Sequence, residues 1–332
     1  MKLNRRAKSF IRRLRIPFEW LGIGLGILTL SSLPRRGMLG VCDFLSRVMY
    51  SLDRSGRKLA LFNLRVIRGA EEVKSLPFAF LKTTRLAPPT RREEMIIRRS
   101  YRNMARTVGH AFWTCRRAKE RAAEAGEMSE AGKRFLAANR PAVTVSGHIG
   151  CWEILSQLAF LEGHSMMSVA KDIGTGGMTR LLMKSRTSIG QEIVHADGAF
   201  RPLMQGIKDG KSLGLLVDQV VKPRNGGVWV RFFGRPVPVS AGPAFFAAKG
   251  KVPVAVAWSR PLHDGRYRCE VLSVYSAHEA REVWRFTQRC IKDLEDVIRR
   301  HPSCWVLNYR YFRKVPDAKE LAQLHVREGK GS

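Results

Sequence analysis

The alternation of short apolar runs with helix-length segments after residue 141 constrains the fold of this chain most strongly. The first pair consists of an apolar run at Ala142–Ser146 followed by a helix-length segment at Cys151–Glu162. This pattern is typical of α/β domains, in which helices cover a largely buried sheet. We therefore predict an α/β fold with a mixed central sheet flanked by helices. The predicted strands are 142–146, 166–170, 191–195, 212–217, 228–232, 252–258 and 266–274, and the predicted helices are 151–162, 177–188, 242–249 and 280–300.

The chain that precedes this alternation has the pattern of helices. Residues 37–69 and 90–117 carry apolar side chains at helical spacing. Residues 118–134 are polar and are predicted to form a solvated helix or a connector. The prediction is therefore a helical region over 37–135 followed by an α/β core over 141–315. The apolar stripe of the first predicted helix consists of Val41, Phe44, Leu45, Val48 and Met49.

The N-terminus combines positive charge with an apolar run. Residues 2–15 hold seven Lys or Arg and no acid, and the uncharged run from Trp20 to Pro34 follows. This run is shorter than the roughly 20 residues that span a bilayer, and Ser31–Arg35 lacks the small-residue cleavage pattern of a signal peptide. We predict that residues 1–36 form an uncleaved helical membrane anchor or a helix lying on an anionic leaflet, where each cation contributes about 1 kcal/mol. A buried core helix is the alternative.

The charge of the whole chain narrows the class of partner. With 59 Lys and Arg against 28 Asp and Glu, the net charge is +31, which favours a polyanionic partner such as nucleic acid or an anionic membrane. The basic residues are spread along the chain and form no known nucleic-acid motif, so a membrane surface is expected and nucleic acid is not. The six cysteines are scattered without a C-x-x-C pair, so neither a metal site nor a disulfide framework is expected, and a reducing compartment is indicated.

His148 and Glu153 are the candidate catalytic pair. His148 follows the apolar run that ends at Ser146, and catalytic groups in α/β sheets collect at the carboxyl ends of strands. Glu153 lies five positions further on, at the start of a predicted helix, from which its carboxylate can reach back and fix the tautomer of the imidazole. The structural alternative is a polar residue at a strand end followed by an ordinary helix charge. Cys151 opens a rival chemistry, covalent catalysis by a thiolate that His148 activates, although a small packing residue is the simpler interpretation.

The segment Gly147–Glu153 resembles the H-x4-D/E motif of glycerolipid-type acyltransferases. It is most similar to the bacterial lipid A (lauroyl/myristoyl) late acyltransferase family, in which Asn is usual at the position of Cys151. Three further blocks resemble that family in order and spacing: 214–219, 227–234 and 240–244. The C-terminal block Pro302–Arg310 resembles its closing Pro-x-x-Trp…Arg pattern.

The resemblance implies a function for the whole of residues 37–332. A membrane-associated O-acyltransferase with a glycerolipid acyltransferase-like fold would move a fatty acyl chain from acyl carrier protein or acyl-coenzyme A to a hydroxyl of a lipid A precursor. Another phosphoglycolipid or an aminolipid is the alternative acceptor. His148 would act as general base and Glu153 would orient it, without a metal or cofactor. The implied location is the cytoplasmic face of the bacterial inner membrane.

The same blocks, and an arginine position between the first two of them, supply candidate substrate-binding residues. Arg186 is the candidate for binding a phosphate of donor or acceptor. Asp218 ends an apolar strand, where an unpaired charge is costly, so it is expected to pair with Arg186 or another cation, or to contact substrate. Phe232 and Phe233 are candidates for an acyl groove, with ordinary core packing as the alternative. Gln219 and Gly234 complete the set through the resemblance.

Overall fold

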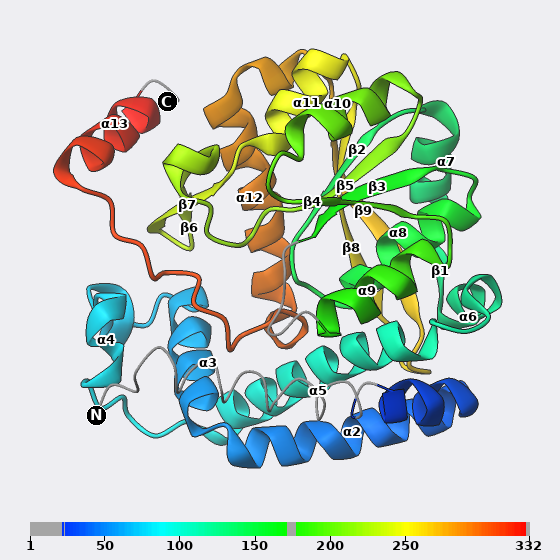
Figure 1. Ribbon diagram of the computed structural model, residues 1–332. Coiled ribbons are helices and arrows are strands. Elements are labelled where there is room, and N and C mark those ends of the chain that lie inside the picture. The colour runs from blue at the N-terminus through cyan, green and yellow to red at the C-terminus, as the bar shows by residue number, and fades with distance from the viewer. Residues whose placement is uncertain (1–21, 23, 171–176, 330–332) are drawn as a thin grey trace, which may run out of the picture.

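The computed structural model of the chain describes residues 22, 24–170 and 177–329. Its centre is a seven-stranded sheet in the order β1-β9-β8-β2-β5-β3-β4, surrounded by helices (Figure 1). Only the β8–β9 pair is antiparallel, so the sheet is mixed, as predicted. The strands of this sheet are β1 (Gly126–Met128), β2 (Val143–Ser146), β3 (Met166–Ala170), β4 (Glu192–His195), β5 (Ser212–Leu216), β8 (Val254–Pro261) and β9 (Tyr267–Tyr275).

Successive side chains of a strand point to opposite sides of the sheet, and in this sheet both sides are apolar. Helices therefore cover both faces. In β8, Val254 and Val256 belong to the main core, whereas Ala255 and Ala257 belong to smaller apolar clusters on the opposite face. The helices of the main-core side are α10 (Phe200–Lys208), α11 (Gly242–Gly250) and α12 (Val283–Arg300), and those of the opposite side include α7 (Glu130–Ala138) and α8 (Trp152–Leu161). The remaining helices of this part are α6 (Ala118–Ala125), α9 (Gly177–Thr187) and the C-terminal α13 (Ala318–Gly329).

A separate hairpin formed by β6 (Gly227–Phe232) and β7 (Arg235–Ser240) packs against α12. The sequence analysis found β6 and missed β7, which contains Pro236 and Pro238. Proline lacks the N–H that a central strand requires, but it is tolerated at the edge of a small sheet. β1, α10 and α13 were also missed, β1 because it lies inside the polar segment 118–134.

The N-terminal helices form a layer below the sheet, where α2 and α5 lie side by side (Figure 1). The predicted helix over 37–69 is two helices, because Asp53 caps the second by accepting the N–H of Gly56. The predicted helix over 90–117 is α5, which opens with a capping box between Thr90 and Glu93. The N-terminal helices are α2 (Arg35–Leu52), α3 (Arg54–Ile67), α4 (Glu71–Lys74) and α5 (Arg91–Trp113), and a 3₁₀ turn at Phe78–Lys82 lies between α4 and α5. Elsewhere in the described chain, 3₁₀ turns lie at Pro223–Asn225, Glu279–Arg281 and Pro302–Cys304.

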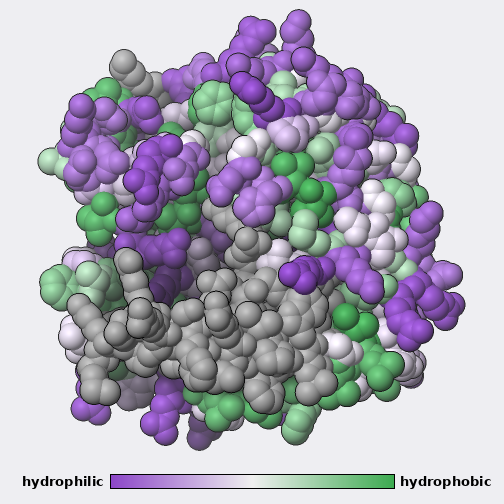
Figure 2. Space-filling model, viewed as in Figure 1, coloured by the Kyte–Doolittle hydropathy of each residue, from purple (hydrophilic) through white to green (hydrophobic). Residues whose placement is uncertain are grey.

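Helix α2 is apolar on two faces. Its buried face packs against α5 and includes Met38 and Cys42, whereas most of the stripe by which the sequence analysis identified it faces outward. The exposed apolar residues of α2 are Phe44, Leu45, Val48, Met49 and Leu52, which we call the α2 outer face. Apolar residues also gather along the lower edge of the molecule, where α2 lies, in the space-filling view (Figure 2).

Most of the predicted anchor, residues 1–36, lies outside the described residues. Of its described part, residues 22 and 24–36, residues 24–32 are helical and are followed by α2, which begins at Arg35. Within the described ranges, no helix is both long enough and apolar enough to cross a membrane.

Candidate active site

His148 and Asp218 meet at the carboxyl edge of the sheet. β2 and β5 are neighbouring parallel strands in which Ser146 is aligned with Leu216, so the residues two positions beyond each strand are also aligned. The imidazole Nδ1 of His148 lies 2.7 Å from Oδ1 of Asp218, and the backbone N–H of His148 donates to Oδ2 over 2.8 Å. Strand register therefore brings together two residues that are far apart in the sequence.

Asp218 is fully buried and held as an anion by its neighbours. The indole Nε1–H of Trp305 donates to Oδ2 over 2.9 Å. Burial alone would raise the pKa of Asp218, but the electrostatic attraction of the His148 imidazole and the hydrogen bonds from His148 and Trp305 outweigh burial and lower it. Gly147 permits this close approach, because a Cβ there would lie 3.1 Å from the Asp218 carboxyl carbon.

The Asp218 carboxylate determines which nitrogen of His148 is basic. A carboxylate only accepts hydrogen bonds, so Nδ1 carries the hydrogen and Nε2 has the free lone pair. The His148 side chain is 20% exposed, so a reactant can reach it. The amide Nε2 of Gln219 lies 3.2 Å from His148 Nε2 and donates to that lone pair. Gln219, a predicted site residue, thus lies beside His148 Nε2, and the Trp152 ring contacts the imidazole edge-on.

Glu153 does not fill the position that the sequence analysis gave it. Its buried carboxylate binds the guanidinium of Arg186 in a bidentate pair, with distances of 2.8 and 2.7 Å. Burial would raise the pKa of Glu153, but the charge and hydrogen bonds of Arg186 outweigh burial and lower it. The carboxylate that binds and orients the imidazole in this structure is that of Asp218, because β5 places it beside Nδ1, whereas the first turn of α8 places Glu153 against Arg186 of α9.

The same pair bears on two other predictions. Asp218 was expected to pair with Arg186 or another cation, and its partner is His148. Arg186 was expected to bind a substrate phosphate, but both its Nε and its Nη2 donate to Glu153. Burial would lower the pKa of Arg186, but Glu153 outweighs burial and raises it, as expected for a structural ion pair.

Cys151 has the properties of a packing residue. It is completely buried in the apolar cluster between α8 and the N-terminal helices. Burial, with a smaller contribution from the Glu153 charge, raises the pKa of its thiol to about 12. A thiol with this pKa stays protonated at neutral pH, so the structure disfavours Cys151 as a nucleophile.

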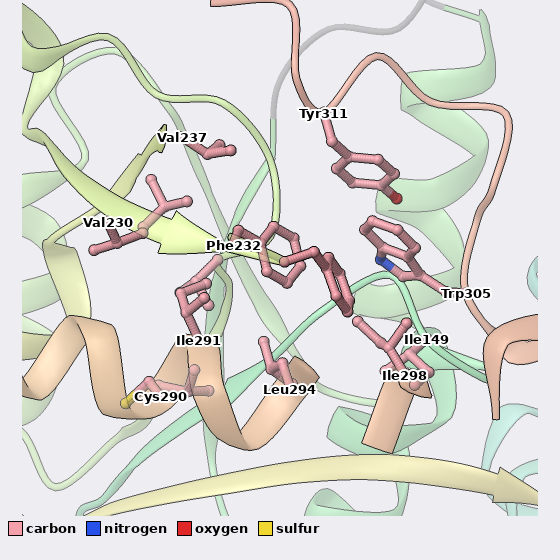
Figure 3. Close-up of a cluster of buried hydrophobic side chains, with 14 of the residues drawn as sticks. Ile149, Val230, Phe232, Val237, Cys290, Ile291, Leu294, Ile298, Trp305 and Tyr311 are labelled. Atoms are coloured by element: carbon pink, nitrogen blue, oxygen red, sulfur yellow. The ribbon is translucent and has the colours of Figure 1, made fainter. Parts of the chain in front are cut away.

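The phenylalanines proposed for an acyl groove lie in the main core instead. Phe232 and Phe233 stack with ring centroids 4.6 Å apart, and both contact Trp305. Figure 3 shows Phe232, Trp305 and Tyr311 together in this core. Tyr311 stacks on the other side of that indole, with the centroids 3.9 Å apart. Gly234 lies in the turn between β6 and β7 with a φ of 76°, a conformation that suits glycine. These residues support Trp305, and through Trp305 they support Asp218.

Trp305 is the site residue that the sequence analysis did not assign. It lies in the C-terminal block, and its segment pairs with the loop that carries His148: Ile149 and Trp305 form a β-bridge, and Val306 N–H donates to the His148 carbonyl over 3.2 Å. The sequence signal available for Trp305 was its place shortly after Pro302, which follows the last core helix.

The fold and site define an α/β protein with a histidine–aspartate pair at the carboxyl edge of its sheet, an arrangement suited to general-base chemistry. Residues 87–314 match the model of the bacterial lipid A biosynthesis acyltransferase family, and the chain belongs to this family. No curated protein matches the chain. The matched range contains His148, Asp218 and Trp305.

Proposed function

We propose that this protein transfers a fatty acyl chain from an acyl thioester to a hydroxyl of a lipid A precursor, with His148 as general base. The observation that carries the proposal is the buried Asp218 carboxylate bound to Nδ1 of a partly exposed His148. The family match supports acyl transfer as the reaction. Acyl carrier protein or coenzyme A is the proposed carrier of the acyl group.

The reaction requires one proton to move twice. His148 Nε2 takes the proton of the acceptor hydroxyl while the oxygen attacks the thioester carbonyl. The tetrahedral intermediate then collapses, the carbon–sulfur bond breaks, and the imidazolium returns the proton to the leaving thiolate. Asp218 stabilises the imidazolium between these steps, and general-base assistance of this kind contributes roughly 10²–10⁴-fold in rate. Gln219 lies at the approach to Nε2, so we assign it contact with the acceptor.

Membrane association is part of the proposal. Phe44 is 62% exposed and Leu52 is 78% exposed, and three further apolar residues of the α2 outer face lie between them on the helix. An apolar stripe on the surface of a chain of charge +31 suits a helix that lies in the headgroup region of an anionic leaflet. The proposed location is the cytoplasmic face of the bacterial inner membrane.

The test is acyl transfer in vitro from acyl carrier protein and, separately, from acyl-coenzyme A to a lipid A precursor. His148→Ala is expected to lower kcat by roughly 10²–10⁴-fold. Cys151→Ser, the matched control in the same loop, is expected to retain most activity because Cys151 is buried and protonated. Transfer to another phosphoglycolipid or an aminolipid, but not to the lipid A precursor, would refute the proposed acceptor. A trapped acyl-enzyme in the wild type that Cys151→Ser abolishes would refute the general-base mechanism.

A further inference from the structure

A cavity of about 560 Å³ is bordered by the end of α3, the first half of α5 and the end of α12. Five of its lining residues are arginines, and none is Asp or Glu. We call this cavity the arginine pocket. It is lined by Ile67, Arg68, Arg92, Met95, Ile96, Arg99, Arg299, Arg300, His301, Pro302 and Ser303.

The arginines of the pocket have few countercharges. Within the described part of the chain, Arg68 and Arg299 have only long ion pairs, of 3.9 Å to Glu93 and 4.0 Å to Glu295. Both of these glutamates lie outside the lining. Glu93 is already held by Arg65, over 3.1 Å. Among the described residues, the structure gives no ion pair to Arg92, Arg99 or Arg300. Like charges gathered in one cavity repel each other, and a bound anion would remove that cost.

Helix geometry explains why these side chains share one cavity. Arg92, Met95, Ile96 and Arg99 follow each other at three- and four-residue spacing, so they lie on one face of α5. Arg299 and Arg300 close the last turn of α12, where cations interact favourably with the helix dipole. The dipole accounts for arginines at the end of α12. It does not account for Arg92, which lies in the first turn of α5 at the positive end, or for Arg99, two turns further along.

The pocket adjoins the segment that supports the active site. Ser303, in its lining, accepts a hydrogen bond from Asn103 of α5 over 2.8 Å. The next residue, Cys304, accepts the N–H of Gly150 over 2.8 Å, and Trp305 then binds Asp218. A ligand in the pocket therefore contacts the same C-terminal segment that positions the loop carrying His148.

The chemistry of the pocket and its rim indicates the class of ligand. A concave cluster of guanidinium groups matches phosphate, whose oxygens accept forked hydrogen bonds, better than it matches the convex surface of an acidic protein helix. Met95, in the lining of the pocket, is 45% exposed, and Ile96 beside it also lines the cavity, so apolar side chains border the guanidinium groups. An apolar surface beside a cationic cavity suits an amphiphile.

We propose that the arginine pocket binds the phosphate of a lipid headgroup. The proposal deepens the proposed function, since it rests on a phosphorylated lipid as acceptor, but it concerns binding and can be tested without acyl transfer.

The test compares Arg92→Gln/Arg99→Gln with Arg134→Gln/Arg201→Gln, a control that removes the same charge from exposed positions on α7 and α10. The probe is phosphatidylcholine vesicles that contain phosphatidic acid, and binding is measured by sedimentation at low salt, where screening is weak. The pocket variant is expected to bind about tenfold more weakly than the wild type, as loss of guanidinium–phosphate bonds predicts, and the control variant to bind like the wild type. Equal binding by the two double variants would overturn the proposal.

A second probe, inorganic pyrophosphate, separates a lipid phosphate from a soluble one. If the pocket variant loses pyrophosphate binding in calorimetry while its vesicle binding is unchanged, the site takes a soluble phosphate and the lipid assignment is wrong. His148→Ala should keep wild-type binding in both experiments. Failure of the pocket proposal is therefore distinguishable from failure of the proposed function. The latter would appear as a wild-type protein that binds vesicles but transfers no acyl chain. Thermal unfolding of each variant checks that the exposed substitutions leave the fold intact.

Discussion

At the scale of single residues, the environment of each carboxylate decides its role. Asp218 lies beside Nδ1 of His148, 70 positions away in sequence, whereas Glu153, only five positions away, faces Arg186. Local spacing identified the histidine because a strand end is a recognisable place for a catalytic group. The partner of His148 depends on the register of β2 against β5, which no local pattern encodes, and so the sequence analysis assigned the nearer carboxylate.

The Glu153–Arg186 pair gives a prediction about stability. Removing one member of a buried ion pair leaves the other charge unpaired, so Glu153→Gln is expected to lower the free energy of unfolding by about 3–5 kcal/mol. Adding Arg186→Met should restore part of this loss. Because the folded pKa of Glu153 is lowered, its contribution is present above the unfolded value of about 4.3 and is lost as the pH falls through the folded pKa.

Urea unfolding of the wild type and both variants between pH 7 and pH 3 would measure this effect. The difference between the wild type and Glu153→Gln should shrink as the pH falls below about 4. A difference that does not vary with pH, or a double variant less stable than the single one, would show that the pair does not act as an ion pair.

At the scale of elements, patterning predicted most of the strands and helices and failed where an element was atypical. In β7 the alternating Val237 and Val239 are separated and preceded by prolines, which are unusual in strands, and β1 has only three residues inside a charged segment. The apolar stripe over 41–49 correctly indicated a helix, but periodicity cannot say which face of a helix is buried. The structure places most of that stripe outside, with Met38, Cys42 and Tyr50 on the buried face.

The α2 outer face gives a prediction about membrane binding. Phe44→Asp/Leu52→Asp replaces two exposed apolar side chains, each of which would contribute about 1.5–3 kcal/mol when fully buried in lipid. Partial burial still predicts at least about tenfold weaker binding to phosphatidylglycerol vesicles. Val315→Asp/Val326→Asp is the matched control, because these valines are 68% and 58% exposed and lie outside α2. If the control weakens binding equally, charge alone explains the effect and the α2 outer face is not the contact.

At the scale of the whole molecule, the sheet and the C-terminal segment act together on one loop. The loop after β2 carries His148, the end of β5 supplies Asp218, and the segment after α12 supplies Trp305. Phe232, Phe233 and Tyr311 pack around the indole in the core. The tautomer of His148 therefore depends on the complete fold. The arginine pocket borders the same C-terminal segment.

The central claim, that Asp218 and not Glu153 orients the catalytic imidazole, is tested most directly by comparing kcat of Asp218→Asn and Glu153→Gln. Both variants are to be assayed at a temperature at which unfolding curves show each to be folded. An amide cannot stabilise the imidazolium, so Asp218→Asn is expected to lower kcat by about 10²–10⁴-fold with little change in KM. Folded Glu153→Gln is expected to keep a much larger share of the wild-type rate. Near-wild-type turnover in Asp218→Asn, with a loss of orders of magnitude in folded Glu153→Gln, would contradict the account.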